Sequence, residues 1–312
     1  MKTLPAKFKP MLSATYEEGK TELTFPLLMS PKLDGYRAVG GPLKKDTVVF
    51  SKNLKPLRNE WLQQHFNDPR IAGLDGELIV GKPTGQGVFN RTSSGVTKKT
   101  GEPDVYFYVF DCFLDPDAPF SARLAIAELK VQEIAGSLRV KFVPHTLVRN
   151  MKEYLAFEKK CLKEGYEGVM GRSPDGPYKF GRATPKEGYL WKGKRFRDGE
   201  ATVVRFEEAE QNTNEATKDE LGRTKRSSAK AGKVAKGMVG TIVGKDTKTG
   251  EELRIGPGRL TEKMRKQLWS EREQHEGTMV VKYRVFDYGA KDTPRFPTCQ
   301  GICGQDDVSL EG

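Results

Sequence analysis

Hydrophobic and polar positions follow two different spacings along the first 197 residues of the chain, one typical of strands and the other typical of helices. Short runs rich in β-branched and aromatic residues predict strands at 47–51, 77–80, 105–110 and 168–172. Apolar residues spaced three and four apart predict helices at 58–66, 121–135 and 151–163. This mixture of strands and helices predicts an α/β (α+β) domain that covers residues 1–197.

The pattern changes near residue 198, where short strands take over. We predict strands at 201–206, 238–244, 252–255 and 278–287. A single helix is predicted at about 262–273, with Thr261 as its N-terminal cap. Several short strands and one helix predict a small all-β barrel, such as an OB-fold, over residues 198–312.

Residues 211–237, between the first two predicted strands of the second domain, form a strongly polar segment. The segment contains seven Lys or Arg residues against three Asp or Glu residues. A segment this polar is unsuited to burial, and its excess of positive charge suits contact with phosphates. We expect a DNA-contacting loop that becomes ordered only on binding, and a plain solvated loop is the alternative.

The composition indicates a phosphate-bearing partner and gives no sign of a membrane segment. The chain has 312 residues and a net charge of +11, and cations bind polyanions by releasing their counterions. No apolar run has membrane-spanning length and the N-terminus lacks the apolar part of a signal peptide, so a cytoplasmic protein is expected. The four cysteines, Cys112, Cys161, Cys299 and Cys303, are scattered, and only the last two lie close together, with no histidine near them. Free thiols are expected rather than a zinc site or a disulfide.

The stretch SPKLDGYR, residues 30–37, places one lysine among charged and turn-forming residues. The amine of a lysine such as Lys32 becomes a useful nucleophile when burial or a neighbouring cation disfavours its charge. Arg37 could supply that cation or bind a phosphate or sugar, and Asp34 could orient the amine. Asp-Gly is also a common turn pair, so a simple turn after a strand is the alternative.

Five further charged stretches lie at the ends of predicted strands. They are SKNLKPLR (51–58), LDGELIV (74–80), FYVFD (107–111), EGYEGVMGR (164–172) and LWKGK (190–194). Lys192 and Lys194 of the last stretch are two residues apart, which places both on one face of a strand. Cations on one face suit the charge that develops on a phosphate during its transfer.

These six stretches, in this order, resemble the motif set of the covalent nucleotidyltransferases, which comprise ATP-dependent DNA ligases, RNA ligases and mRNA capping enzymes. The resemblance covers nearly the whole chain. It is greatest to the small bacteriophage ATP-dependent DNA ligases, because residues 214–230 and 237–244 resemble their inserted loop and the strand after it. The resemblance implies a nucleotidyltransferase adenylation domain followed by an OB-fold DNA-binding domain.

The resemblance also implies a role for each motif residue. Lys32 would attack the α-phosphate of ATP, form a covalent lysyl–AMP and expel pyrophosphate, together with Asp34, Lys192 and Lys194 as the other catalytic residues. Glu167 and Glu77 would be the carboxylates for Mg²⁺ or Mn²⁺, with Glu77 also at the ribose. The implied ATP-binding residues are Ser30, Pro31, Leu33, Arg37, Ser51, Lys52, Asn53, Glu77, Phe110 (stacked on adenine), Arg182, Lys186 and Lys192.

Two places depart from the family pattern. Lys52 stands where the family has arginine, so the positive charge is kept and the fork of donors is lost. In the C-terminal motif Arg295 fits, whereas no arginine stands near Cys303, where a second one is expected. Either lysine adenylation is weaker than in the family or Lys291 substitutes for the missing arginine.

The sequence therefore predicts an ATP-dependent DNA ligase that works as a monomer in DNA repair, replication and recombination. It would seal 5′-phosphate/3′-hydroxyl nicks in duplex DNA, with contacts to the DNA from Lys55, Arg58, Lys225, Arg226 and Lys230. An RNA ligase or a capping-type enzyme is the first alternative. A non-catalytic nucleic-acid-binding protein is the second, although the catalytic motif positions are all present.

Overall fold

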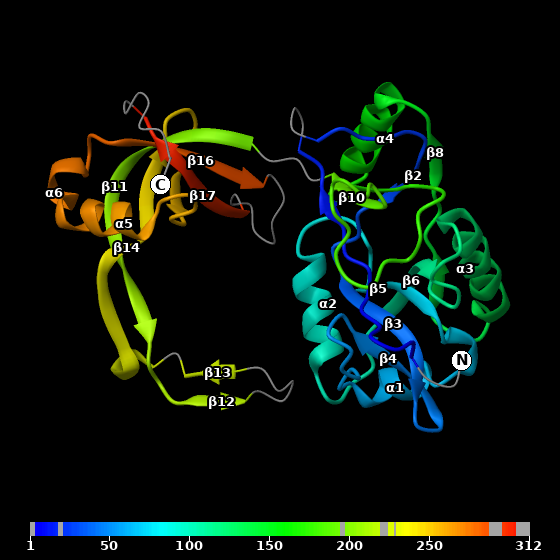
Figure 1. Cartoon of the computed structure of the whole chain (residues 1–312). Coiled ribbons are helices and arrows are strands. Elements are labelled where there is room, and N and C mark those ends of the chain that lie inside the picture. The colour runs from blue at the N-terminus through cyan, green and yellow to red at the C-terminus, as the bar shows by residue number, and fades with distance from the viewer. Residues whose placement is uncertain are drawn as a thin grey trace. The chain divides into compact units, whose positions relative to one another are not determined.

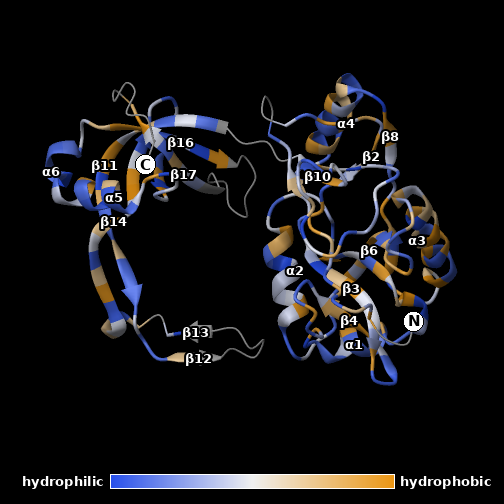
Figure 2. Cartoon of the chain, viewed as in Figure 1, coloured by the Kyte–Doolittle hydropathy of each residue, from blue (hydrophilic) through white to orange (hydrophobic). Residues whose placement is uncertain are grey.

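The structure is a computed structural model that describes residues 4–17, 21–193, 197–218, 224–227, 229–286 and 295–303. The chain divides into two compact units, Met1–Lys194 and Arg195–Gly312 (Figure 1). Hydrophobic positions alternate with hydrophilic ones along the strands and helices of both units (Figure 2). Each unit accordingly has a hydrophobic core of its own.

Two five-stranded sheets form the framework of the first unit. The first has the order β4-β3-β5-β6-β7, with only the β6–β7 pair parallel. Its strands are β3 (Tyr36–Leu43), β4 (Asp46–Ser51), β5 (Leu74–Val80), β6 (Val105–Cys112) and β7 (Val140–Phe142). The second has the order β1-β10-β9-β2-β8, with only the β1–β10 pair parallel. Its strands are β1 (Ala14–Thr15), β2 (Leu27–Pro31), β8 (Thr146–Val148), β9 (Val169–Arg172) and β10 (Leu190–Gly193).

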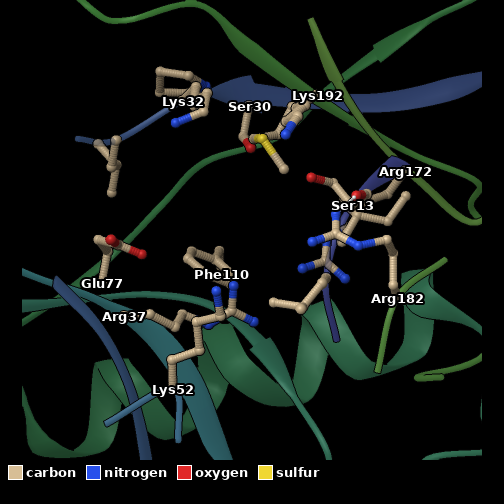
Figure 3. A pocket seen from close by; sticks show the side chains of 15 residues that line it. Ser13, Ser30, Lys32, Arg37, Lys52, Glu77, Phe110, Arg172, Arg182 and Lys192 are labelled. Atoms are coloured by element: carbon tan, nitrogen blue, oxygen red, sulfur yellow. Dashed lines mark hydrogen bonds between the residues drawn. The ribbon is translucent and has the colours of Figure 1, made fainter. Parts of the chain in front are cut away.

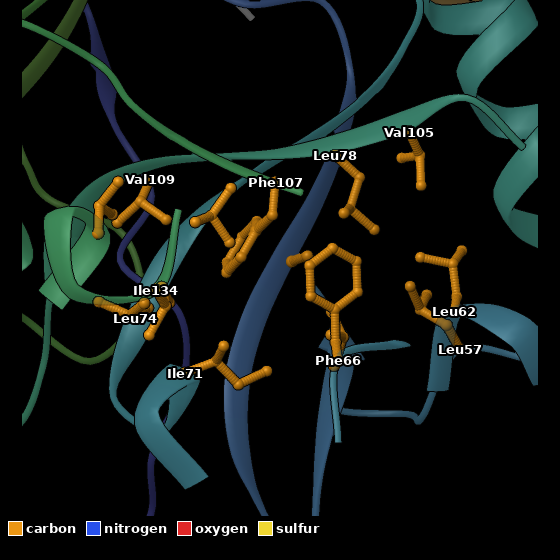
Figure 4. Close-up of a cluster of buried hydrophobic side chains, with 14 of the residues drawn as sticks. Leu57, Leu62, Phe66, Ile71, Leu74, Leu78, Val105, Phe107, Val109 and Ile134 are labelled. Carbon is orange, nitrogen blue, oxygen red and sulfur yellow. The ribbon is translucent and has the colours of Figure 1, made fainter. Parts of the chain in front are cut away.

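Helices pack against both sheets of the first unit. The helices are α1 (Glu60–His65), η1 (Pro69–Ile71), α2 (Val88–Thr97), α3 (Phe120–Ile134) and α4 (Met151–Lys163). The first sheet is contacted by α1, α2 and α3, and the second by α4 through β2. Between the first sheet and its helices lies a fully buried cluster that includes Phe66, Leu78, Phe107 and Ile134 (Figure 4).

The alternation along β6 explains how the first sheet serves both a core and a site. Val105, Phe107 and Val109 are fully buried against the helices. Successive side chains of a strand point to opposite faces, so the intervening Tyr106, Tyr108 and Phe110 face away from this core. The face turned away from the helices is therefore the one that carries aromatic and charged residues.

The second unit contains a curled five-stranded sheet with the order β15-β14-β11-β16-β17. A bridge between Gly256 and Thr298 joins the end of β15 to β17, so the sheet closes only in part. Its elements are β11 (Arg197–Asn212), β14 (Lys233–Asp246), β15 (Glu252–Ile255), α5 (Glu262–Ser270), α6 (Arg272–His275), β16 (Val280–Phe286) and β17 (Arg295–Ile302). Five strands in a partly open barrel are the architecture of an OB-fold, which confirms the predicted fold class.

The predicted helices 121–135 and 151–163 lie within one residue of α3 and α4. Thr261 caps α5 as predicted, since its hydroxyl accepts a hydrogen bond from the Met264 N–H at 3.3 Å. The helix predicted at 262–273 is divided at Glu271 into α5 and α6. Helix α2 was not predicted, because its sequence, VFNRTSSGVT, is poor in strong helix formers.

Residues 211–237, expected as a DNA-contacting loop that becomes ordered on binding, contain regular strands in the part that the structure describes. β11 and β14 extend into this segment, and between them β12 (Ala216–Lys218) pairs with β13 (Thr224–Arg226), followed by the short helix η2 (Lys230–Gly232). Long antiparallel strands satisfy their own backbone groups, so a polar segment can be ordered without being buried. We call residues 211–237 the basic hairpin.

All four cysteines are free, as predicted. Within the part of the chain that the structure describes, no helix is both long and apolar enough to cross a membrane.

Candidate active site

A pocket of about 260 Å³ lies between the two sheets of the first unit. We call it the inter-sheet pocket. It is lined by Leu12, Ser13, Ser30, Pro31, Lys32, Leu33, Arg37, Lys52, Glu77, Phe110, Met170, Arg172, Arg182, Leu190 and Lys192. Six of these residues are Lys or Arg and only one is acidic, so the pocket suits an anionic ligand.

Strand pairing brings the lining residues together in rows. In the second sheet, Ser30 of β2 and Lys192 of β10 both pair with Met170 of β9. In the first sheet, Arg37 of β3 pairs with Glu77 of β5. Figure 3 shows Ser30, Lys32 and Lys192 on one side of the pocket, facing Glu77 and Arg37 on the other. The two rows therefore form opposite walls.

Lys32 follows the last residue of β2, and its backbone N–H donates to the Gly168 carbonyl at 2.9 Å. This bond places Lys32 next to Glu167, the residue before Gly168. The Lys32 ammonium forms an ion pair with the Glu167 carboxylate. The Glu167 side chain is 7% exposed and that of Lys32 is 21% exposed. The amine is therefore shielded on one side and open to the pocket on the other.

A buried carboxylate fixes Arg37 in the wall of the pocket. The Nε and Nη2 atoms of Arg37 donate to Asp75 at 2.7 and 2.6 Å, and the Tyr178 hydroxyl donates to the same carboxylate at 2.6 Å. Burial is the largest single influence and lowers the pKa of Arg37, but the charge and hydrogen bond of Asp75, together with Tyr178 and Glu77, outweigh it, and the pKa lies above its usual value. Arg37 also donates to the Met11 carbonyl at 3.2 Å, which ties the N-terminal segment to the site.

A second buried network lies behind Phe110. Arg172 donates to Asp111 at 2.5 Å and Arg123 donates to the other oxygen of Asp111 at 3.0 Å, and all three side chains are nearly inaccessible. The guanidinium carbons of Arg37 and Arg172 lie 4.8 and 5.6 Å from the centre of the Phe110 ring. Two anchored cations thus lie close to the ring, and because Phe110 lines the pocket, the ring can contact a flat ligand there.

Glu77 is the acidic residue of the inter-sheet pocket. Burial raises its pKa to about 7, against the opposing effect of the Arg37 and Lys32 charges. Its charge state therefore changes close to neutral pH. A carboxyl group in this state can donate a hydrogen bond below pH 7 and act as a pure acceptor above it.

The structure gathers most of the predicted site residues in this pocket. Those that line it are Ser30, Pro31, Lys32, Leu33, Arg37, Lys52, Glu77, Phe110, Arg182 and Lys192. Those that do not line it are Asp34, Ser51, Asn53, Glu167 and Lys186, and Lys194 lies outside the described residues. Ser51 is buried where it bonds to Lys55 in a turn, and Lys186 is exposed.

Five lining residues were not predicted: Leu12, Ser13, Met170, Arg172 and Leu190. Met170 and Arg172 could have been found in the sequence, because they are two residues apart in a predicted strand and so share one face of it. In the structure they pair with Ser30 and Leu28. Leu12 and Ser13 had none. They reach the pocket because Leu12 pairs with Arg182, whose guanidinium donates to the Ser13 carbonyl at 2.8 Å.

The described residues contain no group of three acidic, His or Cys side chains that could hold a metal ion alone. The histidines lie apart from the pocket, in structural contacts: His65 accepts from the Arg139 N–H at 3.0 Å and stacks on Trp61. Burial lowers the pKa of His145 to about 4. A metal in the inter-sheet pocket would thus depend on single carboxylates and on ligands supplied by the nucleotide.

The predicted DNA contacts are divided between the two units. Lys55 and Arg58 are half-buried on the first unit. Arg226, which donates to the Asn214 carbonyl, and Lys230 are exposed on the basic hairpin. The side chain of Lys225 lies outside the described part of the chain. The second unit also has a hollow of about 410 Å³ whose cations, Lys248, Arg259, Lys282 and Arg284, outnumber its acids, Asp198 and Glu200.

A family model described as the ATP dependent DNA ligase domain matches residues 10–194 of the chain. The DNA ligase of African swine fever virus is 29% identical over 181 residues, which make up 55% of this chain and 40% of that ligase. The chain thus spans about two fifths of the length of this curated relative. The matched residues include every element of the inter-sheet pocket.

Solved structures extend the similarity to both units. A crystal structure of the Chlorella virus DNA ligase-adenylate is 30% identical, with 96% of this chain and 99% of that chain covered and a TM-score of 0.52. A structure from an analysis of Lig E DNA ligases is 21% identical, with 94% and 98% covered and a TM-score of 0.60. At that identity the second match supports the fold alone.

Proposed function

This chain belongs to the family of ATP-dependent DNA ligase domains, and we propose that it is an ATP-dependent DNA ligase. In this proposal it seals nicks between a 5′-phosphate and a 3′-hydroxyl in duplex DNA and passes through a covalent lysyl–AMP. The observation that carries the proposal is the position of Lys32, whose amine faces a pocket with five other cations and one acid. Such a pocket suits a nucleotide whose phosphates lie against a nucleophile.

The chemistry begins at the Lys32 amine. It must lose one proton before it can attack, and Glu167 is the carboxylate that the structure places beside it. A bond then forms between Nζ and the α-phosphorus while the bond from that phosphorus to the leaving oxygen breaks, and pyrophosphate departs. Lys192, in the row beside Ser30, offsets the charge on the α-phosphate.

We assign the nucleoside part of ATP to the wall of the first sheet, across the pocket from Lys32. Phe110 offers a ring face for adenine, with Met170 on the other side of the pocket. Glu77 offers a carboxylate to the ribose hydroxyls, and Arg37, held by Asp75, fixes the wall beside it. Lys52 and Arg182 at the rim would contact phosphate oxygens.

A divalent cation such as Mg²⁺ fits this donor set. Mg²⁺ is commonly held by one or two carboxylates together with substrate phosphates and water, and it does not need a cage of protein ligands. Glu167 would hold it, with Glu77 as a second carboxylate. When bound, the cation would neutralise charge on the phosphates.

Nicked duplex DNA is the proposed partner. The basic hairpin and the cationic hollow of the second unit supply positive charge for the phosphate backbone, and Lys55 and Arg58 supply it on the first unit. The chain is proposed to act as a monomer.

The basic hairpin predicts a change in the salt dependence of DNA binding. Replacing both Arg226 and Lys230 with alanine should reduce the slope of log affinity against log salt by about two, because each lost phosphate contact removes about one unit. The slope is measured by titrating a nicked duplex at several salt concentrations. The control is the double replacement of Lys152 and Lys159 by alanine, which removes the same charge from the exposed face of α4. Equal slopes in the two double variants would count against a role of the hairpin.

The pKa of Glu77 predicts a pH dependence of nucleotide binding. With a pKa of about 7, Glu77 is mostly protonated at pH 6 and mostly ionised at pH 8. The ionised form is the stronger acceptor for the ribose hydroxyls, since a hydrogen bond to a charged group is worth about 1.5–3 kcal/mol. We expect the wild type to bind an α,β-methylene analogue of ATP about tenfold more tightly at pH 8 than at pH 6.

Calorimetric titration with the analogue measures this effect without covalent reaction. The phosphates of the nucleotide titrate in the same range, so the control is Glu77→Gln, which cannot ionise. The variant should show only the weaker pH dependence that comes from the nucleotide. The same slope in both proteins would show that Glu77 does not contact the ligand in its ionised form.

The experiment that tests the proposed function compares substrates in one assay. The full chain is incubated with Mg²⁺ and either ATP or GTP, and with nicked duplexes in which the broken strand is DNA or RNA. Sealing of nicked DNA with ATP supports the proposal. Sealing of RNA alone would indicate an RNA ligase, and transfer of GMP to the protein would indicate a capping-type enzyme. DNA binding without any nucleotide transfer would indicate a non-catalytic protein.

A further inference from the structure

One wall of the inter-sheet pocket comes from the N-terminal part of the chain, where Leu12 and Ser13 line it. Figure 3 shows Ser13 on the side of the pocket away from Lys32 and Glu77. We call residues 11–13 the N-terminal wall. The wall precedes strand β1, so its position depends on contacts beyond the regular pairing of that strand.

Hydrogen bonds through Met11 join the N-terminal wall to Arg37 in a closed circuit. The Met11 N–H donates to the Tyr178 hydroxyl at 3.2 Å, and that hydroxyl donates to Asp75 at 2.6 Å. Asp75 also accepts from Arg37, and Arg37 in turn donates to the Met11 carbonyl at 3.2 Å. The circuit therefore uses both backbone polar groups of Met11, a residue that is only 1% exposed.

The next residue of the wall is held by the chain segment that follows Tyr178. The Leu12 N–H donates to the Gly181 carbonyl at 2.8 Å, and the Leu12 carbonyl accepts from the Ala183 N–H at 2.8 Å. Residues 178–183 thus provide the surface on which the N-terminal wall lies, and Tyr178 is the point where this surface connects to Asp75.

The hydrophobic core fixes the ring of Tyr178. The ring centre lies 6.1 Å from that of Phe8 and 5.7 Å from that of Phe113, and the residue is 2% exposed. Burial raises the pKa of the Tyr178 hydroxyl well above its usual value, and the charge of Asp75 adds to this effect. The hydroxyl therefore stays protonated, so it can donate to Asp75 while it accepts from Met11.

We propose that Tyr178 is a positioning residue for nucleotide binding, whose hydroxyl holds the N-terminal wall against Arg37 in the shape that receives ATP. The identity of this ligand rests on the proposed function. Tyr178 is not among the residues that line the pocket, so it acts through Met11 and does not touch the nucleotide. Because the wall lies away from Lys32, loss of the hydroxyl weakens binding and leaves the rate of the covalent step unchanged.

Tyr178→Phe tests the proposal, because it keeps the ring and removes only the hydroxyl. The buried Met11 N–H then loses its acceptor, so the wall occupies its position for a smaller fraction of the time, and the apparent affinity falls by that fraction. The chain is first treated with pyrophosphate to remove any AMP already bound to Lys32. We expect the half-saturating ATP concentration for labelling to rise about tenfold and the maximal rate to stay unchanged.

Tyr189→Phe is the matched control. Tyr189 is half-buried and packs against the hydrophobic cluster that contains Tyr178, but it takes no part in the circuit. The control removes the same group from the same cluster. It should be labelled with the half-saturating ATP concentration of the wild type, and both variants should unfold at the same denaturant concentration within about one kcal/mol of stability.

Hydrogen exchange measures the position of the wall directly. The Met11 and Leu12 amides should exchange more slowly when the α,β-methylene analogue of ATP is bound, because coupling between two binding events is reciprocal. In the free protein, Tyr178→Phe should speed the exchange of both amides, and Tyr189→Phe should not. Faster exchange together with unchanged binding of the analogue would show that the wall does not contribute to the nucleotide site, and the proposal would fail.

The kinetic result has equally definite outcomes. An unchanged half-saturating ATP concentration in Tyr178→Phe, or a lower maximal rate alone, would overturn the proposal. If the wild type binds the analogue in calorimetry but is not labelled by ATP, the proposed function fails, and the affinities of the two variants for the analogue still decide the role of Tyr178. A wild type that neither binds the analogue nor is labelled would overturn both.

Discussion

Replacing Lys32 with alanine is expected to abolish covalent labelling of the protein by ATP that carries its label on the α-phosphate. In the structure the Lys32 amine is the basic nitrogen that the chain presents to the pocket beside the Glu167 carboxylate. Lys192 lies in the neighbouring row, and the role proposed for it is to bind the phosphate. Loss of a nucleophile removes the covalent step entirely, so the expected change is from stable labelling to none.

Lys32→Arg is the control for charge. Arginine keeps the positive charge beside Glu167 but is not deprotonated in proteins, so it cannot act as the nucleophile. Both variants should remain folded, because Lys32 is partly exposed and its backbone bond to Gly168 does not involve the side chain. Labelling is read on a denaturing gel. Residual labelling of either variant would mean that another residue carries the nucleotide.

The largest expected effect on stability comes from Asp111→Ala. Asp111 is fully buried and is the carboxylate that both Arg123 and Arg172 contact, and these two side chains are 1% and 4% exposed. Burial already lowers the pKa of Arg172, which shows how strongly its charge depends on the neighbouring carboxylate. Breaking a buried pair by removing one partner costs about 3–5 kcal/mol, because a charge is left without compensation.

We therefore expect Asp111→Ala to lower the free energy of unfolding of the first unit by about 3–5 kcal/mol, measured by denaturant titration. The control is Glu262→Gln, which removes an exposed ion pair with Lys266 on α5 and should leave the stability unchanged. Binding of the nucleotide analogue should also weaken in Asp111→Ala, since Arg172 lines the pocket. A stability loss no greater than that of Glu262→Gln would contradict the assigned network.

The residues of the pocket that the sequence could identify share one property. Lys32, Glu77, Phe110 and Lys192 lie in strands or directly after one, inside short stretches whose pattern is local. Local patterns place a residue on a face of a strand, and the order of the strands then brings the faces together. The resemblance to a family supplied the roles, which the patterns alone left open between a site and a turn.

What the sequence could not give depends on long-range pairing. Leu12 and Ser13 belong to a wall of the pocket because an N-terminal segment crosses to residue 182, more than 160 positions away. The buried carboxylates Asp75 and Asp111 stood in the quoted stretches, but only the structure shows that they anchor Arg37 and Arg172. Tyr178, which donates a hydrogen bond to Asp75, lies outside all six motif stretches.

In the proposed reaction the chain transfers AMP from Lys32 to nicked DNA and then seals the nick. The most direct measurement is a single-turnover chase: labelled lysyl–AMP protein is freed of ATP and mixed with an excess of nicked duplex and Mg²⁺. We expect that the label leaves the protein and that each labelled chain seals one nick and releases one AMP. Label that stays on the protein, or that leaves without sealing DNA, would contradict it.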